Sequence, residues 1–498
     1  MLLDDMGERQ RLVSDTMWTG LDWILVAIGG YLFWTFMGKL LIPQDYGIMV
    51  TVLTLYSLLV TILGLSTIET FIKFVPAVRT ELNTFITKFG LYLFPLTLAV
   101  AFVLQMIPES LSQLAYGNTQ MAEGFQILGL LLIFGFAYNA GKGVLYGIRR
   151  YSRIVLTDAL FSVTKLIGAV ILVSAGIKLG WSWAWIAGLG AAGLLALFLS
   201  GFWPSLKGKT VKMKEIANYG LASLFSVPSA WFFYQSQPVF VGMILGLQAA
   251  GLFGVMVIFS GILSVIPGIM YTVFLPAAAQ FSASNKRENL QKLLDNVVRY
   301  LMILQFPLFV VLSAFRVWFI KLFYTASYMP AEVIILPALF GLSLVSFVVF
   351  YGGLLAIIGR PWIRVLAFSI GAVVNIAVIL FTVPVMGIIG AAMGLLLGSV
   401  LSFAVSAVIL RRHGFSSGWP GWRVILALAI FAFSCWFTSG LTTNFALQGA
   451  ILATTPFVYF VILKALRILN QEDYEIVQNL PEVPGKSLLL KAAKLICS

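Results

Sequence analysis

The sequence predicts an all-α polytopic membrane protein with about fourteen transmembrane helices, arranged as two parallel six-helix lobes around a central cleft with two extra C-terminal helices. Of its 498 residues, 60% are hydrophobic and 10% are charged, whereas about 25% of a soluble domain is charged. Fourteen apolar stretches are each about long enough to cross a bilayer as a helix. The expected spans are 18–41, 47–68, 85–107, 124–147, 154–177, 182–203, 219–245, 250–273, 297–319, 332–357, 363–383, 387–410, 422–440 and 445–463.

The first span and the basic residues set the orientation. Trp18–Leu41 is too long for the core of a signal peptide, and no small-residue cleavage site follows it, so we expect it to remain as the first helix. With the N-terminus inside, 27 of the 32 Lys and Arg residues flank inner loops and 4 flank outer loops. This asymmetry satisfies the positive-inside rule. We therefore expect a multi-pass protein of the cell (plasma or inner) membrane with both termini cytoplasmic.

Short motifs recur in the same order about 200 residues apart, which indicates an internal repeat. Six spans per half is an even number, so the two halves share one orientation and surround a cleft. The expected divisions are a lobe at 1–210, a lobe at 211–413, and a last segment at 414–498 with two helices and an amphipathic tail. The matching pairs are Tyr46–Val50 with Phe253–Val257, Phe74–Ala77 with Phe274–Ala277, Phe94–Leu96 with Phe306–Leu308, and Gly190–Leu195 with Gly390–Leu396.

The fifth span carries the deepest charge in the chain. Lys165 is the twelfth of the twenty-four residues 154–177, near the expected bilayer midplane, and Asp158 and Ser162 share its helix face at i−7 and i−3. A lone ammonium at that depth costs about 3 kcal/mol or more, so it should face protein or a wet cavity. It is either a substrate ligand or a structural lysine with a buried partner. An offset of 210 places Asn375 opposite it in the second half.

Other polar residues inside spans complete the candidate substrate-binding set. Asp22, Asp158 and Lys142 are near enough to the cytoplasmic ends of their helices for snorkelling or helix-end effects to explain them about as well. The glutamines are also explained by hydrogen bonds between helices. These further candidates are Asp22, Asn139, Lys142, Tyr234 and Gln237.

Several other functions are not supported. Gly208–Thr210 and Gly485–Ser487 resemble the end of a phosphate-binding loop, but Trp203 and Leu480 stand where it needs a glycine, so we expect no ATP hydrolysis. Two cysteines and the single histidine, His413, indicate no metal site and no cofactor. No carboxylate pair at a fixed spacing suggests an enzyme. The net charge of +13 is spread over inner loops and the amphipathic segments Asn285–Asn296 and Lys486–Ile496, which favours membrane lipids over nucleic acid as partners.

Several short stretches occur in an order and at spacings typical of a known family: Leu41–Gly47 (LIPQDYG), Gly64-Leu65, Lys73-Phe74, Val383-Pro384, and Gly387 with Gly390–Ala392. Over about residues 15–410 the chain thereby resembles the polysaccharide flippase branch of the multidrug/oligosaccharidyl-lipid/polysaccharide exporter superfamily. Members of this family have two six-helix lobes, work by alternating access, and move lipid-linked oligosaccharides from the cytoplasmic to the outer leaflet.

The resemblance implies a substrate with a polyprenyl pyrophosphate head and a glycan, and glycosyltransferases or a polymerase of the same pathway as partners. A cation such as Lys165 suits the anionic head. Two alternatives stay open: an ion-coupled exporter of small amphipathic compounds, and a non-transporting membrane scaffold of glycan assembly. The first would need carboxylates in its cavity to bind cations, whereas the deepest charge here is positive.

Overall fold

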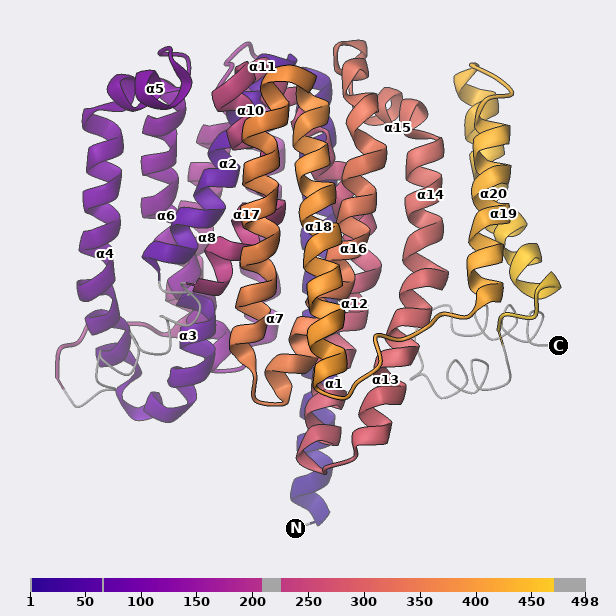
Figure 1. Cartoon of the computed structure of the whole chain (residues 1–498). Helices are drawn as coiled ribbons and strands as arrows, with labels where there is room; N and C mark the ends of the chain where they lie inside the picture. Colours follow the sequence, from indigo (N-terminus) through magenta and orange to yellow (C-terminus); the bar gives the residue numbers. More distant parts are fainter. Residues whose placement is uncertain (1, 65–66, 208–224, 470–498) are drawn as a thin grey trace. The chain divides into compact units, whose positions relative to one another are not determined.

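The computed structural model describes residues 2–64, 67–207 and 225–469, and within them every regular element is a helix (Figure 1). The long helices are α1 (Leu2–Leu40), α2 (Pro43–Leu63), α4 (Leu82–Met106), α6 (Ala122–Gly147), α7 (Tyr151–Ser174), α8 (Gly180–Ser200), α12 (Met256–Ala283), α16 (Glu332–Ile357), α17 (Pro361–Met386), α18 (Ile388–Arg412), α19 (Trp422–Ser439) and α20 (Phe445–Ala465). The shorter ones are α3 (Thr67–Phe74), η1 (Val75–Glu81), α5 (Pro108–Tyr116), α10 (Gln237–Leu245), α11 (Leu247–Gly254), α13 (Arg287–Tyr300), η2 (Leu301–Gln305), α14 (Phe306–Ala314), α15 (Arg316–Phe323) and η3 (Ala326–Ala331).

The helices confirm the prediction of a polytopic all-helical membrane protein. In the described residues, thirteen helical segments are long and apolar enough to cross a membrane, and each overlaps one predicted span. The remaining predicted span, 219–245, lies partly outside the described residues. Its described part is helical at 225–234 and again in α10, with a break at Gln235-Ser236.

The two predicted amphipathic segments have different outcomes. Asn285–Asn296 falls largely within α13, which buries Leu290, Leu294, Val297 and Val298 along one side. This is the pattern of a helix that lies on a hydrophobic surface. The second segment, Lys486–Ile496, lies outside the described residues.

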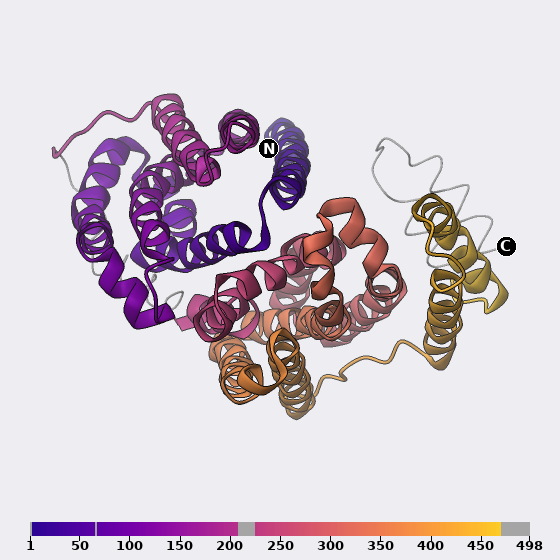
Figure 2. The ribbon, with the colours of Figure 1, turned by 90° about the horizontal axis from the view of Figure 1, so that it is seen from above.

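The chain divides into two compact units. The first contains residues 1–258, 323–331 and 371–395, and the second contains 259–322, 332–370 and 396–498. In the first unit α8 packs against both α6 and α7, and α1 packs along α7. Figure 2, which looks down the helices, shows α1 in indigo beside the purple helices of this group. The predicted lobes at 1–210 and 211–413 stay a prediction.

Within the first unit, α2 and α11 cross with their backbones in contact. A Cβ atom on Gly47 would lie 1.8 Å from the Leu247 carbonyl oxygen, and one on Gly251 would lie 1.7 Å from the Pro43 carbonyl oxygen. The contact is reciprocal, because both pairs join the first residue of one helix to the fifth residue of the other. Glycine is therefore required at both positions for this approach.

A cluster of tyrosines lies beside this crossing. The Tyr46 and Tyr324 hydroxyls are 3.1 Å apart, and the Tyr328 hydroxyl donates a hydrogen bond of 2.9 Å to the Leu41 carbonyl. Lys39 donates to the Tyr324 carbonyl at 2.6 Å. Burial raises the pKa of the Tyr324 phenol, which therefore stays protonated and able to donate.

In the second unit, the two C-terminal helices are fastened to the helix formed by α13, η2 and α14. The η2 turn is a π-helix, and its Ile303 carbonyl accepts a hydrogen bond of 2.9 Å from the Tyr459 hydroxyl of α20. Arg299 donates to the Ile468 carbonyl at 2.8 Å, and the Trp318 indole donates to the Phe445 carbonyl at 2.9 Å. The anchors are distributed from α13 to α15, so α19 and α20 pack as part of this unit.

Candidate functional site

Lys165 lies on the buried side of α7 and is 6% exposed. Its ammonium lies over three aromatic rings, at 4.6 Å from the centroid of Phe161, 5.2 Å from Trp185 and 5.8 Å from Phe33. Among the described residues, no carboxylate lies within ion-pair distance of this ammonium. Ring faces carry partial negative charge and attract a cation by about 0.5–2 kcal/mol each. Three rings from α1, α7 and α8 thus stabilise the charge in place of a carboxylate.

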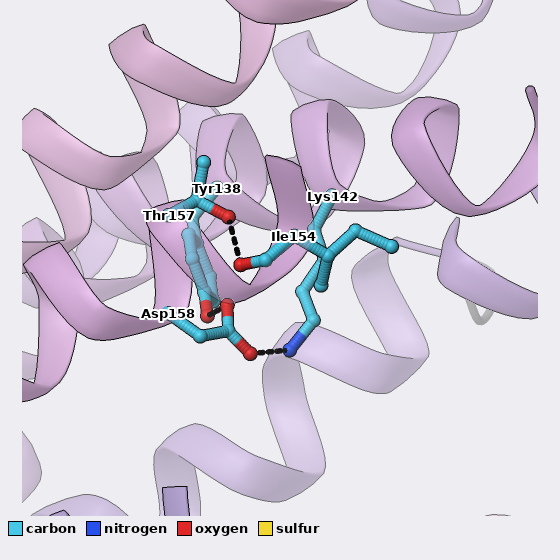
Figure 3. A network of polar contacts seen from close by, with 5 residues as sticks. All are labelled: Tyr138, Lys142, Ile154, Thr157 and Asp158. Atoms are coloured by element: carbon cyan, nitrogen blue, oxygen red, sulfur yellow. Dashed lines mark hydrogen bonds and ion pairs between the residues drawn. The ribbon is translucent and has the colours of Figure 1, made fainter. Parts of the chain in front are cut away.

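A second lysine, Lys142 of α6, forms an ion pair with Asp158 of α7, two turns before Lys165 (Figure 3). Asp158 is 1% exposed, and its other carboxylate oxygen accepts a hydrogen bond of 2.5 Å from the Tyr138 hydroxyl. The Lys142 ammonium also lies 5.7 Å and 5.9 Å from the ring centroids of Tyr138 and Tyr146. Both oxygens of Asp158 are therefore occupied by partners from α6.

Asp22 and Ser162 lie next to these two lysines. Asp22 on α1 is 5% exposed, and its carboxyl interacts electrostatically with Asp158 and Lys142. One of its oxygens, Oδ1, has no hydrogen-bond partner in the described part of the chain, and the same is true of the Ser162 hydroxyl. Buried polar atoms are normally hydrogen-bonded, so these two are candidates for contact with a ligand or an ordered water.

Glycines in the neighbouring helices bring this group together. A Cβ atom on Gly193 of α8 would lie 2.9 Å from the backbone nitrogen of Tyr138, and one on Gly141 of α6 would lie 2.6 Å from the Ala196 side chain. On α1, a Cβ atom on Gly29 would lie 3.0 Å from the Ser162 Cβ atom. Small residues allow helix backbones to approach closely in a membrane, which here brings side chains of four helices to one place.

The candidates from other spans lie elsewhere in the first unit. Asn375 and Gln237 donate hydrogen bonds of 2.8 Å and 3.2 Å to the carbonyl oxygens of Phe232 and Phe233, which precede the break at Gln235-Ser236. A broken helix leaves carbonyl groups unpaired, so both amides cap this break. The Asn375 Oδ1 atom is buried and has no hydrogen-bond partner among the described residues.

Tyr234 and Asn139 are the two candidates with the fewest described contacts. The Tyr234 ring lies 5.8 Å from that of Phe233, at the same break. Asn139 is half-buried on α6, and none of the hydrogen bonds described around Asp158 includes it. The structure therefore gathers Asp22, Lys142, Asp158, Ser162 and Lys165 in one region, and Asn375, Gln237 and Tyr234 in another.

Five rings around the two lysines were not predicted from the sequence: Tyr138, Tyr146, Phe161, Phe33 and Trp185. Three of them carried a local signal, because Tyr138, Tyr146 and Phe161 are each four residues from a lysine on the same helix and so share its face. Phe33 and Trp185 come from other helices and have no such signal.

Residues 36–333 match the model of a family described as polysaccharide biosynthesis protein. The chain belongs to this family. A relative from Haloferax volcanii, the probable low-salt glycan biosynthesis flippase Agl15, is 24% identical over 329 residues, which are 64% of this chain and 68% of that protein. The match confirms the family predicted from the motifs. It also agrees with a multi-pass membrane protein of polysaccharide biosynthesis.

Solved structures of transporters share the fold of this polysaccharide biosynthesis protein. The lipid II flippase MurJ, in an inward closed conformation, superposes with a TM-score of 0.71 at 14% identity, over 91% of this chain and all of MurJ. The multidrug transporter DinF-BH of the MATE family has a TM-score of 0.59 at 17% identity, over 81% of this chain and 95% of that one. The fold is thus that of transporters in the superfamily which the sequence resembles.

Proposed function

We propose that this polysaccharide biosynthesis protein is a flippase, without enzymatic activity, that moves a lipid-linked oligosaccharide from the cytoplasmic to the outer leaflet by alternating access. The observation that carries the proposal is Lys165, a buried cation inside a membrane span with no carboxylate at ion-pair distance in the described residues. The glycan flippase from H. volcanii and the lipid II flippase support the same class of substrate.

The two lysines have different roles in this proposal. Lys142 is neutralised by Asp158, whereas Lys165 is held by rings that leave its three N–H donors without an acceptor in the described part of the chain. A phosphate oxygen is a strong acceptor for such donors, and a charge-assisted hydrogen bond is about twice as strong as a neutral one. Lys165 is therefore the ligand of the pyrophosphate, and the Lys142–Asp158 pair keeps the neighbouring helices in register.

The remaining candidates bind the glycan in this proposal. Asp22, Ser162 and Asn375 each have a buried polar atom without a described partner, so a sugar hydroxyl would satisfy a hydrogen bond that the chain itself leaves unmade. Asn139, Tyr234 and Gln237 supply further polar contacts. The long prenyl tail stays in the lipid. We place the protein in the cell membrane with both termini cytoplasmic, and its two six-helix lobes at 1–210 and 211–413.

A deletion strain that has lost the surface glycan tests the proposal. Lys165→Met keeps the side-chain volume and removes the charge, so we expect it to abolish restoration of the glycan while the protein still accumulates in the membrane. Lys165→Arg should restore part of it. Lys178→Met, at an exposed position after the same helix, is the matched control and should restore it fully. A well-expressed Lys165→Met protein that restores the glycan to the wild-type level would contradict the proposal.

A further inference from the structure

We infer that the rings of Phe33, Phe161 and Trp185 form a sugar-binding subsite, which takes the sugar that is joined to the pyrophosphate while Lys165 takes the phosphate. This inference rests on the proposed function, and it specifies which part of the substrate lies at the rings. It gives the three aromatic residues a role in binding the sugar, which phosphate binding by Lys165 does not by itself require.

The three rings border one region from different directions. Phe161 and Trp185 have their centroids 5.3 Å apart with their planes at 89°, and Phe33 and Trp185 are 5.7 Å apart at 61°. The Lys165 ammonium occupies the space that they border. An aromatic face with partial negative charge attracts a cation. It also attracts the C–H face of a sugar ring, whose hydrogens carry partial positive charge.

Unpaired polar atoms at the rings distinguish a sugar from the other parts of the substrate. The Trp185 indole nitrogen Nε1 and the Ser162 hydroxyl are buried and have no hydrogen-bond partner in the described residues. A prenyl chain would leave both unpaired, and a phosphate has no apolar face to stack on a ring. A sugar has an apolar face and hydroxyl groups on one small ring, so it satisfies the aromatic faces and the polar atoms together.

The contact between Lys165 and the rings selects the sugar next to the phosphate. The ammonium lies 4.6 Å from the Phe161 centroid. Of the sugars in the glycan, only the one that is joined to the bound phosphate is therefore close enough to reach the rings. Because rings and not a carboxylate hold the ammonium, it can turn towards the phosphate without breaking an ion pair. Lys142 lacks this freedom because it is paired with Asp158. The rings thus hold the cation before the substrate arrives and the sugar afterwards.

A binding experiment with two lipids tests this subsite on the purified full-length protein in detergent. The probes are a polyprenyl pyrophosphate and the same lipid with one hexose attached. We expect Trp185→Leu to weaken binding of the hexose-bearing lipid about tenfold, which corresponds to about 1.4 kcal/mol, and to leave binding of the sugar-free lipid unchanged. The matched control is Trp183→Leu, on the same helix at a residue that is 53% exposed, and it should change neither affinity. Lys165→Met should weaken both.

The outcomes separate the subsite from the proposed function. If Trp185→Leu weakens both lipids by the same factor, or neither, the subsite is overturned and the proposed function stands. If the wild-type protein binds neither lipid, the proposed function fails and the subsite with it. Should Trp185→Leu fail to fold, Trp185→Phe keeps an aromatic face and removes the Nε1 donor. Its expected effect is a loss of about threefold on the hexose-bearing lipid alone, and equal effects on both lipids would overturn the inference.

Discussion

The substitution Lys142→Met should destabilise the protein, whereas the same substitution at Lys165 should not. In the ion pair, Lys142 is 16% exposed and Asp158 is 1% exposed. Removing one partner of a buried pair leaves the other charge uncompensated and costs about 3–5 kcal/mol. Because the Tyr138 hydroxyl still donates to Asp158, we expect a value at the lower end, about 3 kcal/mol.

At Lys165 the same reasoning gives a different result. Removing the ammonium loses three ring contacts of about 0.5–2 kcal/mol each. It also removes a charge whose insertion at mid-span costs about 2.5–3.5 kcal/mol. The two contributions oppose each other and are of similar size, and no carboxylate in the described residues is left unpaired. Lys165→Met should therefore be as stable as the wild-type protein, or slightly more stable.

A double-mutant cycle isolates the ion pair. Asp158→Asn retains an oxygen that accepts the Tyr138 hydrogen bond and removes the charge, so Lys142→Met with Asp158→Asn should recover about 2 kcal/mol of the loss caused by Lys142→Met alone. The measurement is thermal unfolding of the purified variants in one detergent, followed by intrinsic fluorescence. A Lys142→Met protein as stable as the wild type, or a Lys165→Met protein that loses as much stability as Lys142→Met, would refute this reasoning.

Three further predictions concern topology and packing. In a cysteine-free background, a cysteine at Asn118 should react with an impermeant thiol reagent added outside cells and one at Ser205 should not; the reverse pattern would contradict the cytoplasmic termini. Gly251→Ala should lower the unfolding temperature by several degrees, because its Cβ atom would lie 1.7 Å from the Pro43 carbonyl oxygen. The control Gly30→Ala should not lower it, because a Cβ atom there has nothing within 4 Å. Equal stability of the two proteins would show that α2 and α11 do not approach so closely. Tyr459→Phe should lower stability by about 1 kcal/mol in the same assay through loss of its 2.9 Å hydrogen bond to the π-helix, and an unchanged unfolding temperature would show that this hydrogen bond contributes nothing.

Much of the fold could be predicted because hydropathy reports on single helices. The length and apolar content of most spans place them within a few residues, and α19 and α20 agree with the predicted 422–440 and 445–463 to within two residues. The predicted 250–273 and 297–319 agree less well, because α12 continues to Ala283 and the helical segment of α13, η2 and α14 covers 287–314. The short helices α3 and α5 were not predicted, since neither crosses the membrane. The break at Gln235-Ser236 also escaped prediction, because the side chains that cap it come from Asn375 as well as from its own span.

The sequence predicted which candidate-site residues share one face of one helix, but not which residues of neighbouring helices contact them. Spacing alone put Asp158, Ser162 and Lys165 on one face, and all three are buried at 1%, 5% and 6% exposure. The partner of Asp158 is Lys142 on the preceding helix. Which side chains of two helices meet depends on packing in three dimensions, and helical periodicity along one helix does not report it.

Flipping by reconstituted protein tests the central claim most directly. The purified full-length chain is placed in vesicles with a fluorescent polyprenyl pyrophosphate glycan, and an impermeant quencher reports how much of the lipid has changed leaflet. We predict that wild-type protein moves the glycan lipid, that Lys165→Met does not, and that Lys178→Met does so at the wild-type rate. Equal rates for wild-type and Lys165→Met vesicles, or no difference between wild-type and protein-free vesicles, would contradict the account.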